Sequence, residues 1–164
     1  MRFEKITDHA FLPERATAHS AGYDFKASES VIIPAHGIAL VPTGIKCKME
    51  PNQCLLLLVR SSMPRKMGLT LANNVGLVDA DYYGNPGNDG HIMFQLMNIT
   101  DKEVQINYGD KIGQGIVTNF YTAEDDAATG ERLGGFGSTS LKDAAEAIFG
   151  TSDIFGMNSW DFYH

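Results

Sequence analysis

A short apolar run delivers two carboxylates and two tyrosines into a turn at residues 76–84, which read Gly-Leu-Val-Asp-Ala-Asp-Tyr-Tyr-Gly. An ionised carboxylate at the end of a buried strand loses solvation, so Asp79 persists there only if it is paired, hydrogen-bonded or used in chemistry. Close to cations, such a carboxylate can act as a general base. The alternative is an ordinary boundary between a strand and a turn, where Asp and Gly are common.

Two further segments carry residue types that suit phosphate groups. Residues 60–66 read Arg-Ser-Ser-Met-Pro-Arg-Lys and follow an apolar run; a guanidinium gives phosphate a bidentate contact, and hydroxyl groups donate to its oxygens. Residues 134–139 read Gly-Gly-Phe-Gly-Ser-Thr; glycines let backbone N–H groups approach an anion, and a ring there could stack on a base. A solvated basic turn and a flexible Gly/Ser-rich segment are the alternatives when each is taken alone.

The elements that must position these residues are mostly strands. Short runs rich in β-branched or aliphatic residues predict strands at 31–33, 38–41, 54–59, 91–97, 104–106 and 112–120, with turns between them, as at 42–44. The close spacing leaves no room for βαβ crossovers, so we expect an all-β sandwich or barrel with little helix. The best helix candidate is Leu141 to Phe149, which Ser140 could cap and Gly150 could end.

Composition indicates one globular domain. A chain of 164 residues can bury about two-thirds of its unfolded surface. The formal net charge of −7 argues against nucleic-acid binding and means that an anionic substrate would need local cations or a metal ion. Nothing resembles a signal peptide or a membrane span, which predicts a cytoplasmic protein. Cys47 and Cys54 match no metal or redox motif and are expected to be buried free thiols.

Five segments in order resemble the five motifs of the trimeric dUTP nucleotidohydrolase (dUTPase) family. They are Ala-Gly-Tyr-Asp at 21–24, Arg-Ser-Ser at 60–62, the run at 76–84, Gly-Asp-Lys-Ile-Gly-Gln at 109–114 and Gly-Gly-Phe-Gly-Ser-Thr at 134–139. The resemblance implies a homotrimer of distorted jelly-roll β-barrels whose sites each use residues from three subunits. It divides the chain into a barrel core (1–121), a flexible arm with the Gly-rich motif (122–140) and an extra tail of unknown role (141–164). The long turn at 85–90 resembles forms from Gram-positive bacteria and their phages.

The resemblance implies hydrolysis of dUTP to dUMP and pyrophosphate by water attacking the α-phosphorus, which controls dUTP and supplies dUMP for dTMP synthesis. Asp79 would activate the water, and Asp81 would be a structural hydrogen-bonding carboxylate. Tyr82 would pack under the deoxyribose and leave no space for a 2′-hydroxyl. Asn73 and the backbone of Leu77, Val78 and Asp79 would hydrogen-bond uracil, with Met93 in a minor base-contacting position.

The remaining implied contacts concern the triphosphate. Phosphate-binding positions are Arg60, Ser61, Ser62, Gln114, Arg132, Gly137, Ser138 and Thr139, and Phe136 would close over the base. Mg²⁺ would be held by the triphosphate and waters, with no direct protein ligand and Asp24 at most in the outer shell. Arg132 lies four residues before Phe136, whereas the family's arginine lies five before, where this chain has Glu131.

Two alternatives compete with this hypothesis. dCTP deaminase resembles dUTPase in fold and in several motifs, but it needs a glutamate base about where this chain has Gln95, and an amide cannot be a general base. The other is a nucleotide-sensing protein that has kept the pocket without catalysis; the presence of Asp79, Ser61 and Gln114 argues against it. The surplus loop at 85–90 and the aromatic residues of the tail leave open a regulatory protein partner in addition to catalysis.

Overall fold

The structure is a computed structural model that describes residues 1–132 and 134. The helix expected over residues 141–149, the tail, and the motif residues Phe136, Gly137, Ser138 and Thr139 therefore lie outside the described residues. Their implied roles stay predictions.

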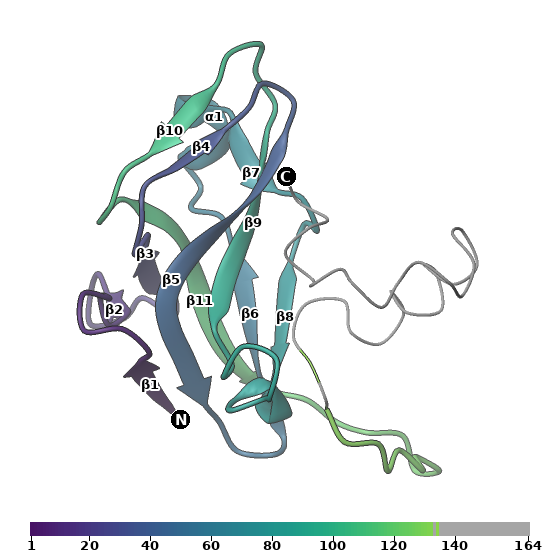
Figure 1. Cartoon of the computed structure of the whole chain (residues 1–164). Helices are drawn as coiled ribbons and strands as arrows, with labels where there is room; N and C mark the ends of the chain where they lie inside the picture. The colour runs from purple at the N-terminus through teal and green to yellow at the C-terminus, as the bar shows by residue number, and fades with distance from the viewer. Residues whose placement is uncertain (133, 135–164) are drawn as a thin grey trace.

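Three antiparallel sheets build the fold (Figure 1). The first has the order β1 (Arg2–Lys5), β5 (Ile38–Lys48), β9 (Ile92–Asn98), β7 (Leu69–Leu71). The second pairs β10 (Val104–Ile106) with β4 (Val31–Ile33). The third has the order β2 (Glu14–Arg15), β3 (Tyr23–Lys26), β11 (Lys111–Asn119), β6 (Gln53–Leu58), β8 (Gly76–Asp79). Within the described residues, helix is limited to α1 (Met63–Met67) and the 3₁₀ turn η1 (Ala80–Tyr82). The expected all-β class with little helix is confirmed.

The strand β5 differs most from its prediction, because residues 42–44 form a bulge and not a turn. The pairing with β9 shifts between Pro42 and Ile45, so the strand continues to Lys48. Proline suits such a position because it has no N–H to give to the ladder. Gly44 supplies the positive φ of 66° there, and the Thr43 hydroxyl donates to the carbonyl of Ile92 at 2.5 Å. The helix α1 was also not predicted, since its segment reads as a basic turn.

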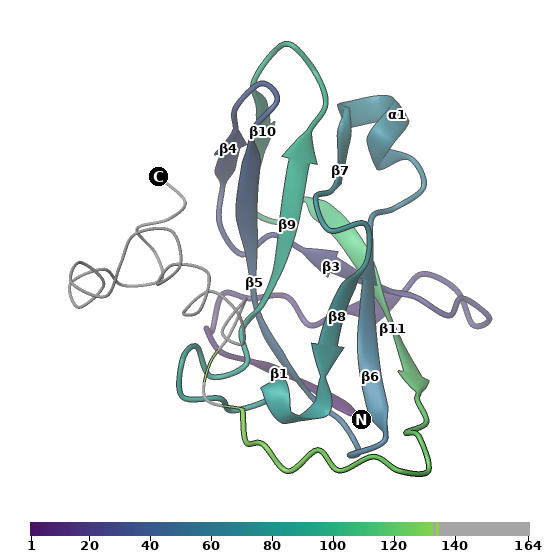
Figure 2. The same cartoon turned by 90° about the vertical axis from the view of Figure 1, so that its right-hand side faces the viewer.

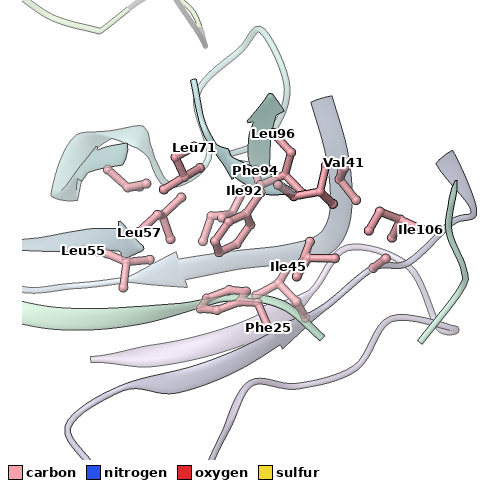
Figure 3. Close-up of a cluster of buried hydrophobic side chains, with 14 of the residues drawn as sticks. Phe25, Val41, Ile45, Leu55, Leu57, Leu71, Ile92, Phe94, Leu96 and Ile106 are labelled. Carbon is pink, nitrogen blue, oxygen red and sulfur yellow. The ribbon is translucent and has the colours of Figure 1, made fainter. Parts of the chain in front are cut away.

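The hydrophobic core lies between the two larger sheets (Figure 3). Phe25 from β3 and Phe94 from β9 are fully buried, and their ring centroids lie 5.5 Å apart. Cys47 and Cys54 are buried free cysteines, as expected, and burial raises the pKa of the Cys47 thiol to about 11. Such a thiol stays protonated and unreactive near neutral pH. No helix in the described residues is long and apolar enough to cross a membrane.

Gly113 on β11 is required by the close approach of Phe94. A Cβ atom added at Gly113 would lie 2.1 Å from Cε1 of Phe94 and 2.8 Å from the carbonyl oxygen of Leu58. We expect Gly113→Ala to destabilise the protein by about 1–3 kcal/mol, the usual cost of overpacking a core. Gly130→Ala is the matched control, since a Cβ there meets nothing within 4 Å. Thermal unfolding at equal protein concentration compares the two, and equal midpoints would contradict this packing argument.

His91 precedes β9 and holds the bulge of β5. The backbone N–H of Gly44 donates to Nε2 of His91 at 2.9 Å, which requires a neutral ring with its proton on Nδ1. Burial lowers the pKa of the His91 imidazole, and the charge of Glu29 opposes this only in part. A proton on Nε2 would remove the acceptor, so the folded chain resists protonation.

This resistance predicts a pH-dependent stability. Below the unfolded-state pKa of about 6.5, the unfolded chain binds a proton that the folded chain rejects, so the stability from His91 is complete above that pH and is lost as the pH falls. We expect the unfolding midpoint of the wild type to drop more between about pH 7.5 and pH 5.5 than that of His91→Gln, whose amide oxygen can accept the Gly44 bond without titrating. If the unfolding midpoints of the two proteins fall equally with pH, this role of His91 is wrong.

Candidate active site

The end of β8 forms one wall of a pocket. Asp79 is the last residue of this strand, and the chain then turns into η1, which carries Tyr82 (Figure 2). The cavity has a volume of about 150 Å³. The cavity is lined by seven residues to which the resemblance assigns a role: Asn73, Leu77, Val78, Asp79, Tyr82, Met93 and Arg132. The other lining residues are Leu57, Leu71, Gly76 and Gln95. The structure thus brings together the residues that the resemblance assigns to the base, the sugar and the attacking water.

β8 stands at the edge of its sheet. It pairs with β6 on one side, with Val78 opposite Leu55 and Leu77 opposite Leu56. Along an edge strand, alternate backbone N–H and C=O groups point away from the sheet. The Leu77 side chain is 61% exposed and Val78 is 7% exposed, so alternate residues face solvent and core. This edge therefore offers main-chain donors and acceptors beside the pocket.

Tyr82 is buried in the pocket wall. Its hydroxyl donates to the carbonyl of His91 at 2.9 Å and accepts from Nδ2 of Asn88 at 2.7 Å. Burial raises the pKa of the Tyr82 phenol, although the hydrogen bond from Asn88 and the charge of Arg132 oppose the rise. The ring is thus a neutral, fixed surface near neutral pH.

Arg132 binds both carboxylates of the 76–84 segment. Its Nε donates to Oδ1 of Asp81 at 2.7 Å, and a terminal amino group is paired with Oδ2 of Asp79. The guanidinium carbon lies 5.8 Å from the centre of the Tyr82 ring. Partial burial alone would lower the pKa of Arg132, but the ion pairs with Asp81 and Asp79 hold it above its ordinary value. The resemblance implies that Arg132 contacts a phosphate; the structure shows its pairs with Asp81 and Asp79, and the phosphate contact stays a prediction.

A second polar cluster forms where β3, β11 and the end of β6 meet. Asp24 is paired with Lys111, Nζ to Oδ2 at 2.7 Å, and with Arg60, Nε to Oδ1 at 3.5 Å. Gln114 lies opposite Asp24 in the β3–β11 register. Gly22 gives the Gln114 side chain its space, because a Cβ there would lie 2.5 Å from the amide oxygen. This cluster joins three segments that resemble separate dUTPase motifs.

Ser61 and Ser62 continue the chain from Arg60 at the same end of β6. Ser61 is exposed, and Ser62 is the residue that precedes the first turn of α1. Arg60, Ser61 and Ser62 are consecutive in the sequence, as in a phosphate-binding segment that combines a guanidinium with hydroxyl groups.

Within one chain, the two groups of residues lie far apart. Asp79 pairs with Cys54 at one end of β6, whereas Gln114 pairs with Leu58 at the other. At ~3.3 Å per residue these positions are about 13 Å apart along the strand, and Arg60 lies still further on. Figure 2 shows α1 and η1 at opposite ends of β6. A water molecule bound to Asp79 is therefore out of reach of a phosphate held by Arg60 of the same chain.

Comparison with known proteins places the chain in a family. The dUTPase family profile matches residues 8–140. The chain is 48% identical over 130 residues to the deoxyuridine 5′-triphosphate nucleotidohydrolase of Lactococcus lactis, over 78% of this chain and 87% of that relative. It is 34% identical over 151 residues to the Helicobacter pylori protein of the same name, over 88% of this chain and 99% of that relative.

Solved structures agree. The dUTPase from Streptococcus mutans superposes with a TM-score of 0.72 at 48% identity, over 74% of this chain and 98% of that chain. The chain belongs to the dUTPase family. The relatives from Lactococcus and Streptococcus are Gram-positive, as the resemblance predicted.

Several residues of the site were not predicted from the sequence as pocket residues. Leu57, Leu71 and Gln95 line the pocket from β6, β7 and β9. Gln95 is singled out in the sequence only as the counterpart of the deaminase glutamate, although its two-residue spacing from Met93 on one strand indicates a shared face. Asn88 was missed because an asparagine in a Gly- and Pro-containing loop reads as a turn former.

Proposed function

We propose that this protein is a dUTP diphosphatase, which hydrolyses dUTP to dUMP and pyrophosphate. The observation that carries the proposal is the pocket in which Asp79, Tyr82 and the edge of β8 meet. Family membership and the identity to the Lactococcus lactis nucleotidohydrolase support it. In this function Asp79 accepts a proton from the water that attacks the α-phosphorus.

Base selection follows from the edge of β8. The backbone groups of Leu77 and Val78, with the amide of Asn73 nearby, can pair with the alternating donor and acceptor edge of uracil. Cytosine carries an amino group where uracil has a carbonyl, so it would set donor against donor. Main-chain groups held in a sheet cannot rotate to accommodate the exchange.

The deaminase alternative is disfavoured by the chemistry of the same pocket. Gln95 lines the cavity on β9, next to Met93 on the same strand face. Attack of water on a pyrimidine ring needs a group that can carry a proton, and a glutamine amide cannot do so. The carboxylate that lines the cavity, Asp79, ends β8, and Asp81 follows it in η1; this placement suits a reaction at phosphorus.

The triphosphate would be bound by the cluster at the other end of β6. Arg60, Lys111 and Gln114 supply cations and an amide, with Ser61 and Ser62 beside them. No three His, Cys, Asp or Glu side chains are grouped as metal ligands in the part of the chain that the structure describes. The cluster fits an ion held chiefly by phosphates, because Asp24 already shares its carboxylate with two cations and has only an outer position to offer. When bound, Mg²⁺ neutralises phosphate charge.

A homotrimer with shared sites would unite the two groups of residues. One chain keeps Asp79 far from Arg60 and Gln114, so the site is incomplete unless another copy supplies the missing half. We propose that the pocket side of one subunit faces the Arg60 side of its neighbour.

Pyrophosphate release from dUTP, dCTP, dTTP and UTP tests the function. We expect strong preference for dUTP, and a fall in kcat of about 10²–10⁴ for Asp79→Asn, since an amide of the same shape cannot accept the proton. The KM for dUTP should change little, because the interaction is made with the water and not with the bound nucleotide. Turnover that survives the substitution, or equal rates with all four nucleotides, would reject the proposal.

Mixed trimers test the shared site. Asp79→Asn and Arg60→Ala should each be nearly inactive alone, but chains mixed in equal amounts should recover about a quarter of the wild-type activity, because a random fraction of sites receives the intact half of each chain. A mixture of Asp79→Asn with Tyr82→Ala is the matched control, since both changes damage the same half and no intact site can form. If neither mixture recovers activity, the shared site is wrong.

A further inference from the structure

The loop at residues 85–90 encloses Tyr82 and contacts both ends of this residue. At the backbone end, Nδ2 of Asn85 donates to the carbonyl of Tyr82 at 2.8 Å, and the Asn85 backbone N–H donates to the same oxygen at 3.4 Å. Asn85 is only 4% exposed although it belongs to a surface loop. Gly90 has a φ of 81°, and a Cβ there would lie 2.8 Å from the Tyr82 carbonyl oxygen, so the loop is packed directly on this residue.

At the other end, the loop holds the phenol. Nδ2 of Asn88 donates to the Tyr82 hydroxyl at 2.7 Å, and that hydroxyl donates to the carbonyl of His91 at 2.9 Å. Asn88 is itself fixed, because its Oδ1 accepts from Nδ2 of Asn85 at 2.8 Å and from the backbone of Gly90 at 3.2 Å. The two asparagines thus connect the carbonyl and the hydroxyl of one tyrosine through a single chain of hydrogen bonds.

We propose that Asn88 is a positioning residue that sets the selectivity of the site for deoxyribose over ribose. The inference rests on the proposed function, in which the Tyr82 ring forms the wall under the sugar. A hydrogen-bonded phenol cannot swing away from the pocket, so a 2′-hydroxyl meets a surface that does not yield. Without Asn88 the phenol loses one of its hydrogen bonds, so the ring tilts about its side-chain bonds at a lower cost and the clash with a ribonucleotide is smaller.

The position of Asn88 favours selectivity over a purely structural role. Its amide reaches the hydroxyl of a residue that lines the cavity, while Asp89 next to it binds Lys46 on β5 at 2.6 Å. The loop therefore has separate attachments: Asp89 ties it to the first sheet, and Asn88 reaches the pocket wall. Comparing a variant that lacks the Asp89 attachment with one that lacks the Asn88 attachment therefore separates anchoring of the loop from positioning of the Tyr82 ring.

The test compares kcat/KM for dUTP and UTP in the same preparation of full-length protein, so the fraction of folded enzyme cancels in the ratio. We expect Asn88→Ala to lower the dUTP/UTP ratio by roughly fivefold to tenfold, the effect of one hydrogen bond that fixes a side chain, chiefly through faster UTP hydrolysis. Asp89→Asn is the control, since it removes the charge pair with Lys46, suits the positive φ of 56° at this position and should leave the ratio unchanged.

A double-mutant cycle with Tyr82→Phe shows whether Asn88 acts through the hydroxyl. In that background, Asn88→Ala should change the ratio no further. An equal loss in both backgrounds, or a proportional fall with both nucleotides, would overturn the inference while leaving the proposed function intact. Failure of the wild type to prefer dUTP over dCTP and dTTP would instead overturn the proposed function.

Discussion

The pairing of β8 with β6 is the constraint on which the rest of the structure depends. Its register sets Gly76 opposite Leu57 and Asp79 opposite Cys54, so the strand ends at the aspartate. A slip by one residue would turn Val78 out of the core and bury Leu77, because side chains alternate between the two faces of a strand. Burial of Val78 therefore fixes where Asp79 leaves the sheet, and η1 then fixes where Tyr82 lies relative to it. The same register separates Asp79 from Arg60 within one chain, and this separation is the reason for proposing a site shared between subunits.

The charged side chains of the site are paired with one another in the structure. Arg132 is paired with Asp79 and Asp81, and both Arg60 and Lys111 are paired with Asp24. On the proposed mechanism, a triphosphate does not meet free cations but competes with carboxylates for them. Exchange of one anion for another yields less free energy than pairing of an isolated charge, and the chain has a net charge of −7. An accompanying Mg²⁺ would neutralise the part of the triphosphate charge that the cations of the protein leave unpaired.

Part of the pocket could be predicted because Gly76, Leu77, Val78, Asp79 and Tyr82 lie within one short segment of the sequence. The apolar run before Asp79 and the motif around it indicate the strand, the turn and the pocket wall, and most strand positions follow from local composition. Predictions failed where distant contacts decide the structure. Residues 42–44 have the composition of a turn, but pairing with β9 holds them in a bulged strand. The ion pair of Arg132 with Asp81 joins residues that are 51 positions apart, and no local pattern indicates it.

Selectivity against a ligand with one extra hydroxyl group depends more on the rigidity of the pocket wall than on the shape of the pocket. A pocket that can relax accommodates a slightly larger ligand at little cost, so an apolar wall alone discriminates weakly against an added hydroxyl group. The discrimination cannot exceed the free energy needed to move the wall. An aromatic ring is rigid in itself, but it turns about two side-chain bonds unless its far end is held. In this chain the far end of Tyr82 is the hydroxyl, and its bonds to Asn88 and His91 join the wall to the 85–90 loop and to the residue that precedes β9. On the proposed function, this loop would support the surface that the sugar meets without lining the pocket itself.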